Sequence, residues 1–317
     1  MVQRIEGNGE TAAPPGWNVS PSEEAGRIIL SFDVEEHFRI EAAAGLVIDP
    51  ALKAHYSERL EPSVRWLLDQ LGRRGIRATF FVVGEIGRDN PDLIRAIHRA
   101  GHELASHSWD HRRVHHLTPA AFREDLRRTK DTFEQITGVA VVGYRAPTFS
   151  IMRPTAWAID VLAELGLLYD SSIYPVRHDR YGVPQAPRGP FLARGAERSI
   201  LELPPALVQL GGVRIPAGGG GYFRLLPLRF LELAIRQVRR ACRPPVATLY
   251  FHPWEFDPDQ PRLPLRRLSR FRTYVGIRRS RGRLTALLDR YRFVSAVEVA
   301  RELDRRRDTL PTFALAE

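Results

Sequence analysis

The sequence predicts an α/β protein in which helices cover a mainly parallel sheet, either open or closed into a barrel. From Arg27 onward, short apolar runs alternate with amphipathic segments, which is typical of parallel strands joined by helices. Segment 177–223 interrupts this alternation, and its many Pro and Gly residues indicate irregular strands and loops. With 317 residues in the chain, we expect a flexible arm over 1–25, a single domain over 26–304 and a tail over 305–317.

The expected strands are short runs rich in β-branched, aromatic and other apolar residues. In chain order they lie at 27–32, 78–83, 102–106, 139–144, 167–170, 246–251 and 293–295. The clearest helix has Thr118 as N-cap and Pro119 at its first position, and it ends at Gly138. Other helices are expected at 64–71, 91–100, 155–165, 284–291 and 296–303.

Composition excludes several classes of protein. An apolar fraction of 44% and a charged fraction of 26% are those of a globular chain, so disorder throughout is excluded. No stretch approaches the roughly 18 uncharged apolar residues of a membrane span, and the N-terminal residues lack the apolar run of an export signal. We therefore expect a cytoplasmic protein, or one bound peripherally at the inner membrane.

The net charge of +10 is carried almost entirely by Arg, since only Lys53 and Lys130 are lysines. Because such a bias can reflect the base composition of a genome, we expect no nucleic-acid partner. The single Cys242 excludes an internal disulfide and a zinc site built from several Cys residues. Any metal must therefore be held by His and carboxylate groups.

Three carboxylates follow the first expected strand: Asp33, Glu35 and Glu36. Carboxylates this close raise one another's pKa unless a cation compensates, so a metal ion or an Arg partner is implied. A helix N-cap cluster or a solvated loop would explain the same residues without any chemistry.

Two His residues, His107 and His111, follow the third expected strand. At this spacing both imidazoles would lie on one face of a helical turn and could bind a single divalent ion such as Zn²⁺. Ser108 stands where the zincin signature requires Glu, which excludes that class of protease. The same spacing also arises by chance, as between His111 and His115.

Arg145 and His252 each follow a further strand. Pro147 pushes the residue before it toward extended geometry, so Arg145 is held at a strand end, where it could pair with one of the crowded carboxylates. A structural ion pair would explain this Arg equally well. His252 is fixed by Pro253, but a lone His in such a place is more often a structural group than a catalyst.

Together and in this order, these residues resemble the motifs of the NodB-homology polysaccharide deacetylases of carbohydrate esterase family four, most closely the subgroup found with exosortase and exopolysaccharide genes. The resemblance covers roughly 27–303. Ser-Phe-Asp at 31–33 stands for the family's Thr-Phe-Asp-Asp, His-Ser/Thr-x-x-His is intact at 107–111, and Arg-x-Pro lies at 145–147. The resemblance implies a distorted (β/α) barrel of about seven parallel strands.

The resemblance also implies metal-assisted amide hydrolysis, with His107, His111 and one carboxylate as ligands, and Zn²⁺ as the expected ion. The family's metal-binding Asp normally follows the catalytic base directly, but Val34 occupies that position and cannot bind a metal. Some deacetylases of this superfamily use a carboxylate two positions after the base. We therefore expect Glu35 as the third ligand, with Glu36 as its rival.

Four further residues acquire roles from the same resemblance. Asp33 would be the general base that takes a proton from water, and His252 would be the general acid that protonates the leaving nitrogen. Arg145 would orient Asp33. Asp170 matches the family's fourth motif without its Trp, and it would pair with His252 to keep that imidazole charged.

The expected substrate is an N-acetylated sugar of a polysaccharide or of its lipid-linked precursor. Tyr144, Tyr222 and Trp254 would contact it, although aromatic residues at such places are as often part of the core. Stretches 219–224 and 252–255 also resemble the exopolysaccharide-associated subgroup. The basic charge would suit an anionic membrane surface. Two other functions remain open: hydrolysis of small amides, as in allantoinase-like enzymes, and glycan binding without catalysis.

Overall fold

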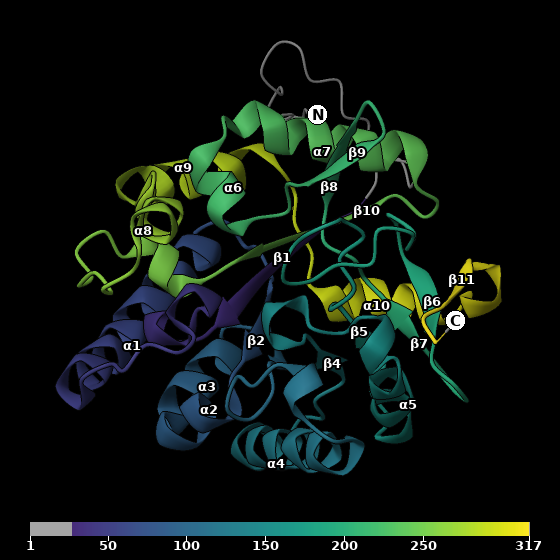
Figure 1. Ribbon diagram of the computed structural model, residues 1–317, viewed down its shortest axis with the longest axis horizontal. Helices are drawn as coiled ribbons and strands as arrows, with labels where there is room; N and C mark the ends of the chain where they lie inside the picture. The colour runs from purple at the N-terminus through teal and green to yellow at the C-terminus, as the bar shows by residue number, and fades with distance from the viewer. Residues whose placement is uncertain (1–26, 317) are drawn as a thin grey trace, which may run out of the picture.

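A curled, mainly parallel sheet organises the computed structural model, which describes residues 27–316 (Figure 1). Within these residues the sheet has nine strands, in the order β10 (Val246–Phe251), β1 (Arg27–Val34), β2 (Thr79–Val82), β3 (Glu103–Ser106), β4 (Gly143–Tyr144), β5 (Tyr169–Asp170), β7 (Ser199–Glu202), β6 (Phe191–Arg194) and β11 (Thr312–Ala314). In this described part, the seven strands from β10 to β7 are parallel, and β6 pairs with β7 in the antiparallel sense. The expected barrel-like α/β fold is confirmed.

The two ends of the seven-stranded parallel region are joined by isolated bridges. The chain that leaves β7 reaches the free edge of β10, where Pro205 bridges to Thr248 and Gly219 bridges to Tyr250. Glycine is required at this second crossing, because a Cβ atom on Gly219 would lie 1.6 Å from the carbonyl oxygen of Tyr250. The barrel is therefore distorted at this seam.

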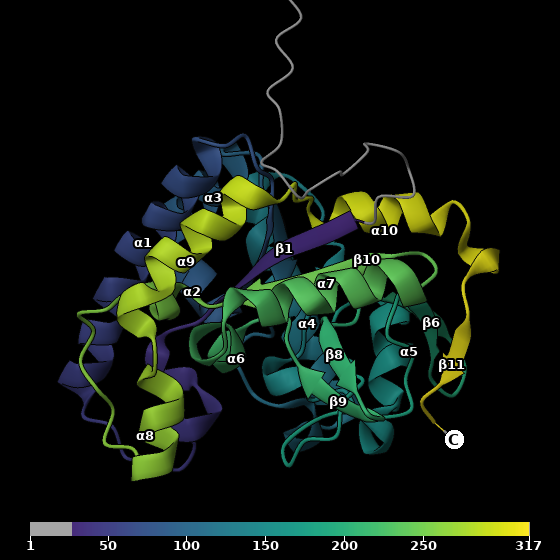
Figure 2. The same ribbon diagram turned by 90° about the horizontal axis from the view of Figure 1, so that it is seen from above.

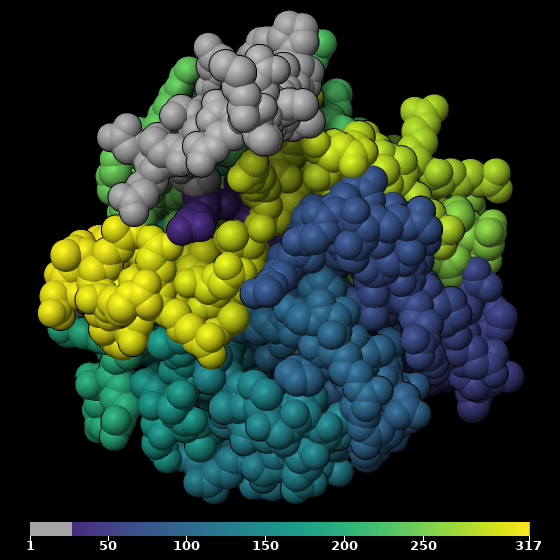
Figure 3. Space-filling view, turned by 180° about the vertical axis from the view of Figure 1, so that it is seen from behind, coloured from purple at the N-terminus to yellow at the C-terminus, as the bar shows by residue number. Residues whose placement is uncertain are grey.

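Helices surround the sheet (Figures 1 and 2). They are α1 (Pro50–Gly72), α2 (Gly84–Asp89), α3 (Pro91–Arg99), α4 (Pro119–Thr137), α5 (Trp157–Glu164), α6 (Gly220–Leu225), α7 (Leu228–Ala241), α8 (Arg267–Tyr274), α9 (Ile277–Arg290) and α10 (Ala296–Asp304). The limits of α4 agree with the sequence: Thr118 accepts a hydrogen bond from the Ala121 N–H, and Gly138 adopts a φ of 72°. At the back of the molecule α9 lies beside α1 (Figure 3), where Arg74 and Asp289 form an ion pair of 2.6 Å.

Both faces of the sheet are buried, as in parallel sheets covered by helices. All of β10 and all but the first residue of β1 are buried. Apolar side chains of these strands pack with those of α1, α3, α7 and α9 in one large cluster, whose members include Phe32, Leu67, Phe80, Phe251 and Leu284. This packed centre fixes the carboxyl ends of the strands, after which the polar residues lie.

Several expected elements differ in length from those observed: the strands expected at 139–144 and 167–170 are shorter, and the helix expected at 284–291 begins at Ile277. The helix expected at 64–71 begins earlier, at Pro50, because the Asp49 side chain accepts hydrogen bonds from two N–H groups of its first turn. The strand expected at 293–295 is reduced to a single bridge between Val294 and β1.

Segment 177–223 is irregular, as expected, but it also contributes regular elements. These are β6, β7, the hairpin of β8 (Leu207–Leu210) and β9 (Val213–Pro216), and the start of α6. The expected tail contains β11, which pairs with β6, whereas the expected arm at 1–25 lies outside the described residues. None of the helices within 27–316 combines the length and the apolar character that crossing a bilayer requires.

Candidate metal and catalytic site

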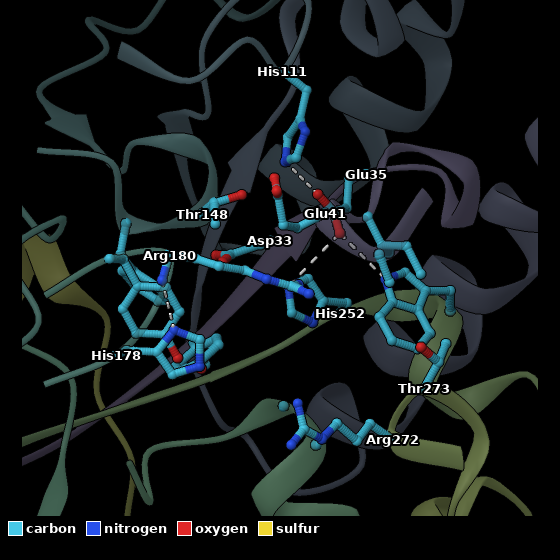
Figure 4. Close-up of a pocket in the computed structure, with 18 of the residues that line it drawn as sticks. Asp33, Glu35, Glu41, His111, Thr148, His178, Arg180, His252, Arg272 and Thr273 are labelled. Carbon is cyan, nitrogen blue, oxygen red and sulfur yellow. Dashed lines mark hydrogen bonds and ion pairs between the residues drawn. The ribbon is translucent and has the colours of Figure 1, made fainter. Parts of the chain in front are cut away.

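A cavity of about 280 Å³ opens at the carboxyl ends of the barrel strands (Figure 4). Its walls come from the end of β1 and residues 40–42 after it, the loops after β3, β4 and β10, helix α6, and two outer segments at 178–181 and 269–273. The expected metal and catalytic residues that line it are Asp33, Glu35, His107, His111 and His252.

Glu35, His107 and His111 form a cluster whose ligand atoms lie within 4.8 Å of one another. A carboxylate oxygen of Glu35 contacts Nε2 of His111. His107 donates from Nδ1 to the backbone oxygen of Arg145 at 2.8 Å, which leaves its Nε2 lone pair for a metal ion. Burial lowers the pKa of His107 to about 4, so its imidazole is neutral, as a ligand must be. The cluster therefore fits a divalent cation.

The turn that carries the two imidazoles is not helical, which corrects the expected helical face. Ser108 and His111 both adopt a φ of 65°, in the left-handed region, and the Ser108 hydroxyl accepts a hydrogen bond of 2.9 Å from the His111 N–H. Asp125 of α4 holds the same turn by accepting from the Trp109 N–H at 2.9 Å. Burial raises the pKa of Asp125 to about 7.

The structure places Glu35, and not Glu36, beside the two imidazoles. The Glu36 carboxylate turns to Arg39, whose Nε lies 2.5 Å away. Val34, which stands where the family has a metal-binding Asp, is fully buried in the core. Moving the carboxylate one residue beyond the end of β1 therefore brings it back toward the cavity, because alternate residues of a strand point to opposite faces.

Asp33 and Arg145 form a buried ion pair. Arg145 donates from Nη1 to Asp33 Oδ1 at 2.6 Å and to the Ser31 hydroxyl at 2.8 Å. Its other guanidinium nitrogens bond the backbone and side-chain oxygens of Ser171, and the guanidinium lies 4.1 Å from the centre of the Phe81 ring. These contacts fix Arg145 completely, so it can orient Asp33 as expected.

His252 is held by Glu255, a residue that the sequence analysis did not select. The His252 Nδ1 lies 2.7 Å from Glu255 Oε1, and its Nε2 faces Asp33 Oδ2 at 3.9 Å and Glu35 Oε1 at 3.8 Å. Burial acts to lower the pKa of His252, but the hydrogen bond to Glu255 and the charges of Glu35, Glu255 and Asp33 raise it to about 9. Glu255 is itself paired with Arg224 at 2.7 Å.

Asp170 does not pair with His252, and the expectation that it would is wrong. Its carboxylate accepts hydrogen bonds from the Ser171 N–H at 2.8 Å and from the Ser172 hydroxyl. Asp170 is also the register partner of Glu202 on β7. Burial raises the pKa of Asp170 to about 6 and that of Glu202 well above its ordinary value, so this pair holds a proton.

Of the three aromatic residues expected to contact substrate, the structure places only Trp254 in the cavity wall. Trp254 donates from Nε1 to Glu35 Oε1 at 3.3 Å. Tyr144 is fully buried and packs edge-on against Phe122, and Tyr222 is half-buried outside the cavity lining. Both are therefore corrections to the expected set.

Segment 178–181 and α8 supply wall residues that the sequence analysis missed. His178 and Tyr181 stack with their ring centroids 4.0 Å apart, and Arg180 and Arg272 also line the cavity. No periodic pattern or motif marks these residues, because they lie in irregular or very short elements.

Two family models match the chain. Residues 56–169 match the polysaccharide deacetylase family, and residues 171–301 match DUF3473, a domain of unknown function. Over 104 residues the chain is 36% identical to the peptidoglycan-N-acetylglucosamine deacetylase PgdA of Listeria monocytogenes, a match that covers 32% of this chain and 20% of that protein. These matches support the NodB-homology polysaccharide deacetylase family.

Solved structures related to the polysaccharide deacetylases share the fold. A protein of Mycobacterium smegmatis assigned to this class is 23% identical, with a TM-score of 0.58 over 95% of this chain and 97% of its own. A Pseudomonas aeruginosa protein of the same assignment is 18% identical, with a TM-score of 0.56 over 88% and 91%.

The site is divided among the two matched regions and the segment before them. The polysaccharide deacetylase region contains His107, His111 and Arg145, whereas the DUF3473 region contains His252 and its partners. Asp33 and Glu35 precede both regions.

Proposed function

We propose that the protein is a metal-dependent deacetylase that removes N-acetyl groups from amino sugars of a polysaccharide or of its lipid-linked precursor. The observation that carries this proposal is a convergence in one cavity: the cluster of Glu35, His107 and His111 adjoins both the Asp33–Arg145 pair and His252. The amide and one water molecule would yield a free amine and acetate.

Glu35, His107 and His111 would hold the metal, and zinc is the ion we propose for two imidazoles and a carboxylate. When bound, such an ion would act as a Lewis acid on the acetamide group. Three protein ligands leave coordination positions open, as catalytic sites require.

Asp33 would accept the proton of the attacking water. Its Oδ1 is taken by Arg145 at 2.6 Å, so Oδ2 is the oxygen that remains free to act as a base. A general base must be ionised to accept this proton. The fixed geometry also spares Asp33 any reorganisation during proton transfer.

His252 would donate a proton to the nitrogen that leaves, so that an amine departs. Its Nδ1 is held by Glu255, which leaves Nε2 facing the cavity. Arg224 fixes Glu255 from the other side. We therefore propose Glu255, in place of Asp170, as the residue that positions His252 and keeps it protonated.

We also propose the exopolysaccharide-associated subgroup for this protein. The two stretches that resemble it in sequence, 219–224 and 252–255, meet in space, since Arg224 of the first donates to Glu255 of the second. Trp254 offers an apolar ring in the cavity wall on which a sugar could stack.

The proposal is tested by measuring acetate release from oligomers of N-acetylglucosamine. We expect the chelated protein to be inactive, zinc to restore release, and Asp33→Asn to bind zinc without turnover. Acetate release that does not depend on added metal would contradict the proposed metal dependence. Zinc bound by a double variant that lacks both His107 and His111 would contradict the proposed ligands.

A further inference from the structure

Helix α8 exposes two large apolar side chains beside the cavity. Leu268 is 61% exposed and Phe271 is 55% exposed. A spacing of three residues places both on one face of the helix. Single exposed apolar residues are common on protein surfaces, but two on adjacent turns form a patch that a partner can cover.

Arginines surround these two side chains. They are Arg266, Arg267, Arg270 and Arg272, all of them exposed. None of the four has a carboxylate oxygen within 4.0 Å in the part of the chain that the structure describes. Their charge is therefore uncompensated, unlike that of Arg59, which pairs with Asp257 at 2.6 Å. Apolar side chains within a basic helical surface are typical of segments that lie in a membrane interface.

An adjoining face of α8 belongs to the cavity wall. Ser269, Arg272 and Thr273 line the cavity, and Figure 4 shows Arg272 and Thr273 at its edge. Arg180 lies on the same wall, with Asp179 at 3.9 Å as its acidic neighbour. In Figures 1 and 2, α8 lies at the margin of the molecule beside α6. A surface that covered Leu268 and Phe271 would thus meet the mouth of the cavity.

We propose that α8 docks this protein on an anionic lipid bilayer, with Leu268 and Phe271 in the interface and the arginines among the headgroups. Anionic headgroups complement the four uncompensated charges. Docking in this orientation brings the cavity to the membrane surface. This docking also indicates a substrate class: an acetylated saccharide carried by the membrane. That step rests on the proposed function.

Sedimentation of the full chain with lipid vesicles tests the docking. We expect binding to vesicles of phosphatidylcholine with phosphatidylglycerol, little binding to phosphatidylcholine alone, and weaker binding as salt rises. Leu268→Ser with Phe271→Ser should lower the partition coefficient about tenfold or more. The matched control is Val139→Ser, which removes a side chain that is 49% exposed and precedes β4, at the opposite end of the barrel.

Failure of the docking can be separated from failure of the proposed deacetylase activity. The double variant should release acetate from a water-soluble oligosaccharide at the normal rate, but more slowly from an acetylated saccharide linked to vesicle lipid. An absence of vesicle binding, or equal binding by the double variant and the wild type, overturns the proposal whatever the activity. Normal vesicle binding without any acetate release overturns the proposed function alone.

Discussion

The two matched regions each place a buried His in the cavity, but they control its charge in opposite ways. In 56–169, His107 donates to a backbone carbonyl, and burial lowers its pKa to about 4. In 171–301, burial acts to lower the pKa of His252, yet Glu255 and the neighbouring carboxylates raise it to about 9. The partner at Nδ1 and the nearby carboxylates therefore decide whether the imidazole is a neutral ligand or a charged acid.

The comparison also shows that the region of unknown function completes the site. Arg224, which fixes Glu255, donates in turn to backbone oxygens of Thr273 and Val275. The His252 assembly is thus built on the same segments that form the outer cavity wall. A deacetylase region without this second half would lack the proposed proton donor.

The largest effect on activity is expected when the neutral imidazole of His107 is removed. His107→Ala should abolish metal binding and lower the rate of acetate release by about 10³-fold or more, because a ligand is lost. Metal content and acetate release check this. His115→Ala, which changes a neighbouring exposed imidazole, should leave both unchanged. Normal metal content in His107→Ala would contradict the proposal that His107 is a metal ligand whereas His252 is an acid.

Loss of the charged imidazole of His252 should give the next largest effect on activity. His252→Ala should lower kcat by ~10²–10⁴-fold, because the leaving nitrogen loses its proton donor. Unlike His107→Ala, it should retain the metal. Steady-state kinetics and metal analysis of the same preparation check both points, with His116→Ala, an exposed imidazole outside the cavity lining, as control. If metal is lost as well, the division of roles between the two regions is wrong.

Glu255 and Asp170 can be compared directly. Glu255→Gln should lower kcat ~10–100-fold with little change in KM, because a neutral amide cannot stabilise the imidazolium of His252. Glu255→Asp should recover part of the rate. Asp170→Asn should lower kcat less, since its carboxylate bonds Ser171 and Ser172. An equal or larger kcat loss in Asp170→Asn would contradict the proposal that Glu255 is the residue that keeps His252 protonated.

The smallest effect concerns the pH dependence of stability in the deacetylase region. Burial raises the pKa of Asp125 from its ordinary value of 3.8 to about 7. Between these values the folded state binds the proton more tightly than the unfolded chain does, so stability falls as pH rises through this window.

Asp125→Asn should remove this slope while its side-chain oxygen still accepts from Trp109. Thermal unfolding across the window, followed for the variant and the wild type, measures the effect as several degrees in Tm. Parallel curves for the two proteins would show that Asp125 does not titrate as described.

Much of the site could be predicted because its residues directly follow strands. Asp33, His107, Arg145 and His252 are far apart in the chain, yet the carboxyl ends of parallel strands meet at one end of a barrel. Six of the seven parallel strands followed from the alternation of apolar runs with helical segments, whereas β7 lies in the segment that was expected to be irregular. The third ligand, Glu35, was reached through the family motif and its departure at Val34.

Other features depend on folding that no local pattern marks. Glu255 becomes the partner of His252 because the chain after β10 forms a short turn that brings the fourth residue back to the first. The turn after β3 is not helical, because Ser108 and His111 take left-handed backbone angles. Helix α8 has eight residues, too few for a periodic signal.

Arg145 contacts two groups of the site at once. Its carbonyl oxygen accepts a hydrogen bond from His107 Nδ1, and its guanidinium donates one to Asp33. A displacement of the chain after β4 would therefore move His107, the candidate ligand, together with Asp33, the candidate base. One residue thus links the candidate ligand His107 to the candidate base Asp33. Replacing the Arg145 side chain would release the base while the ligand kept its anchor.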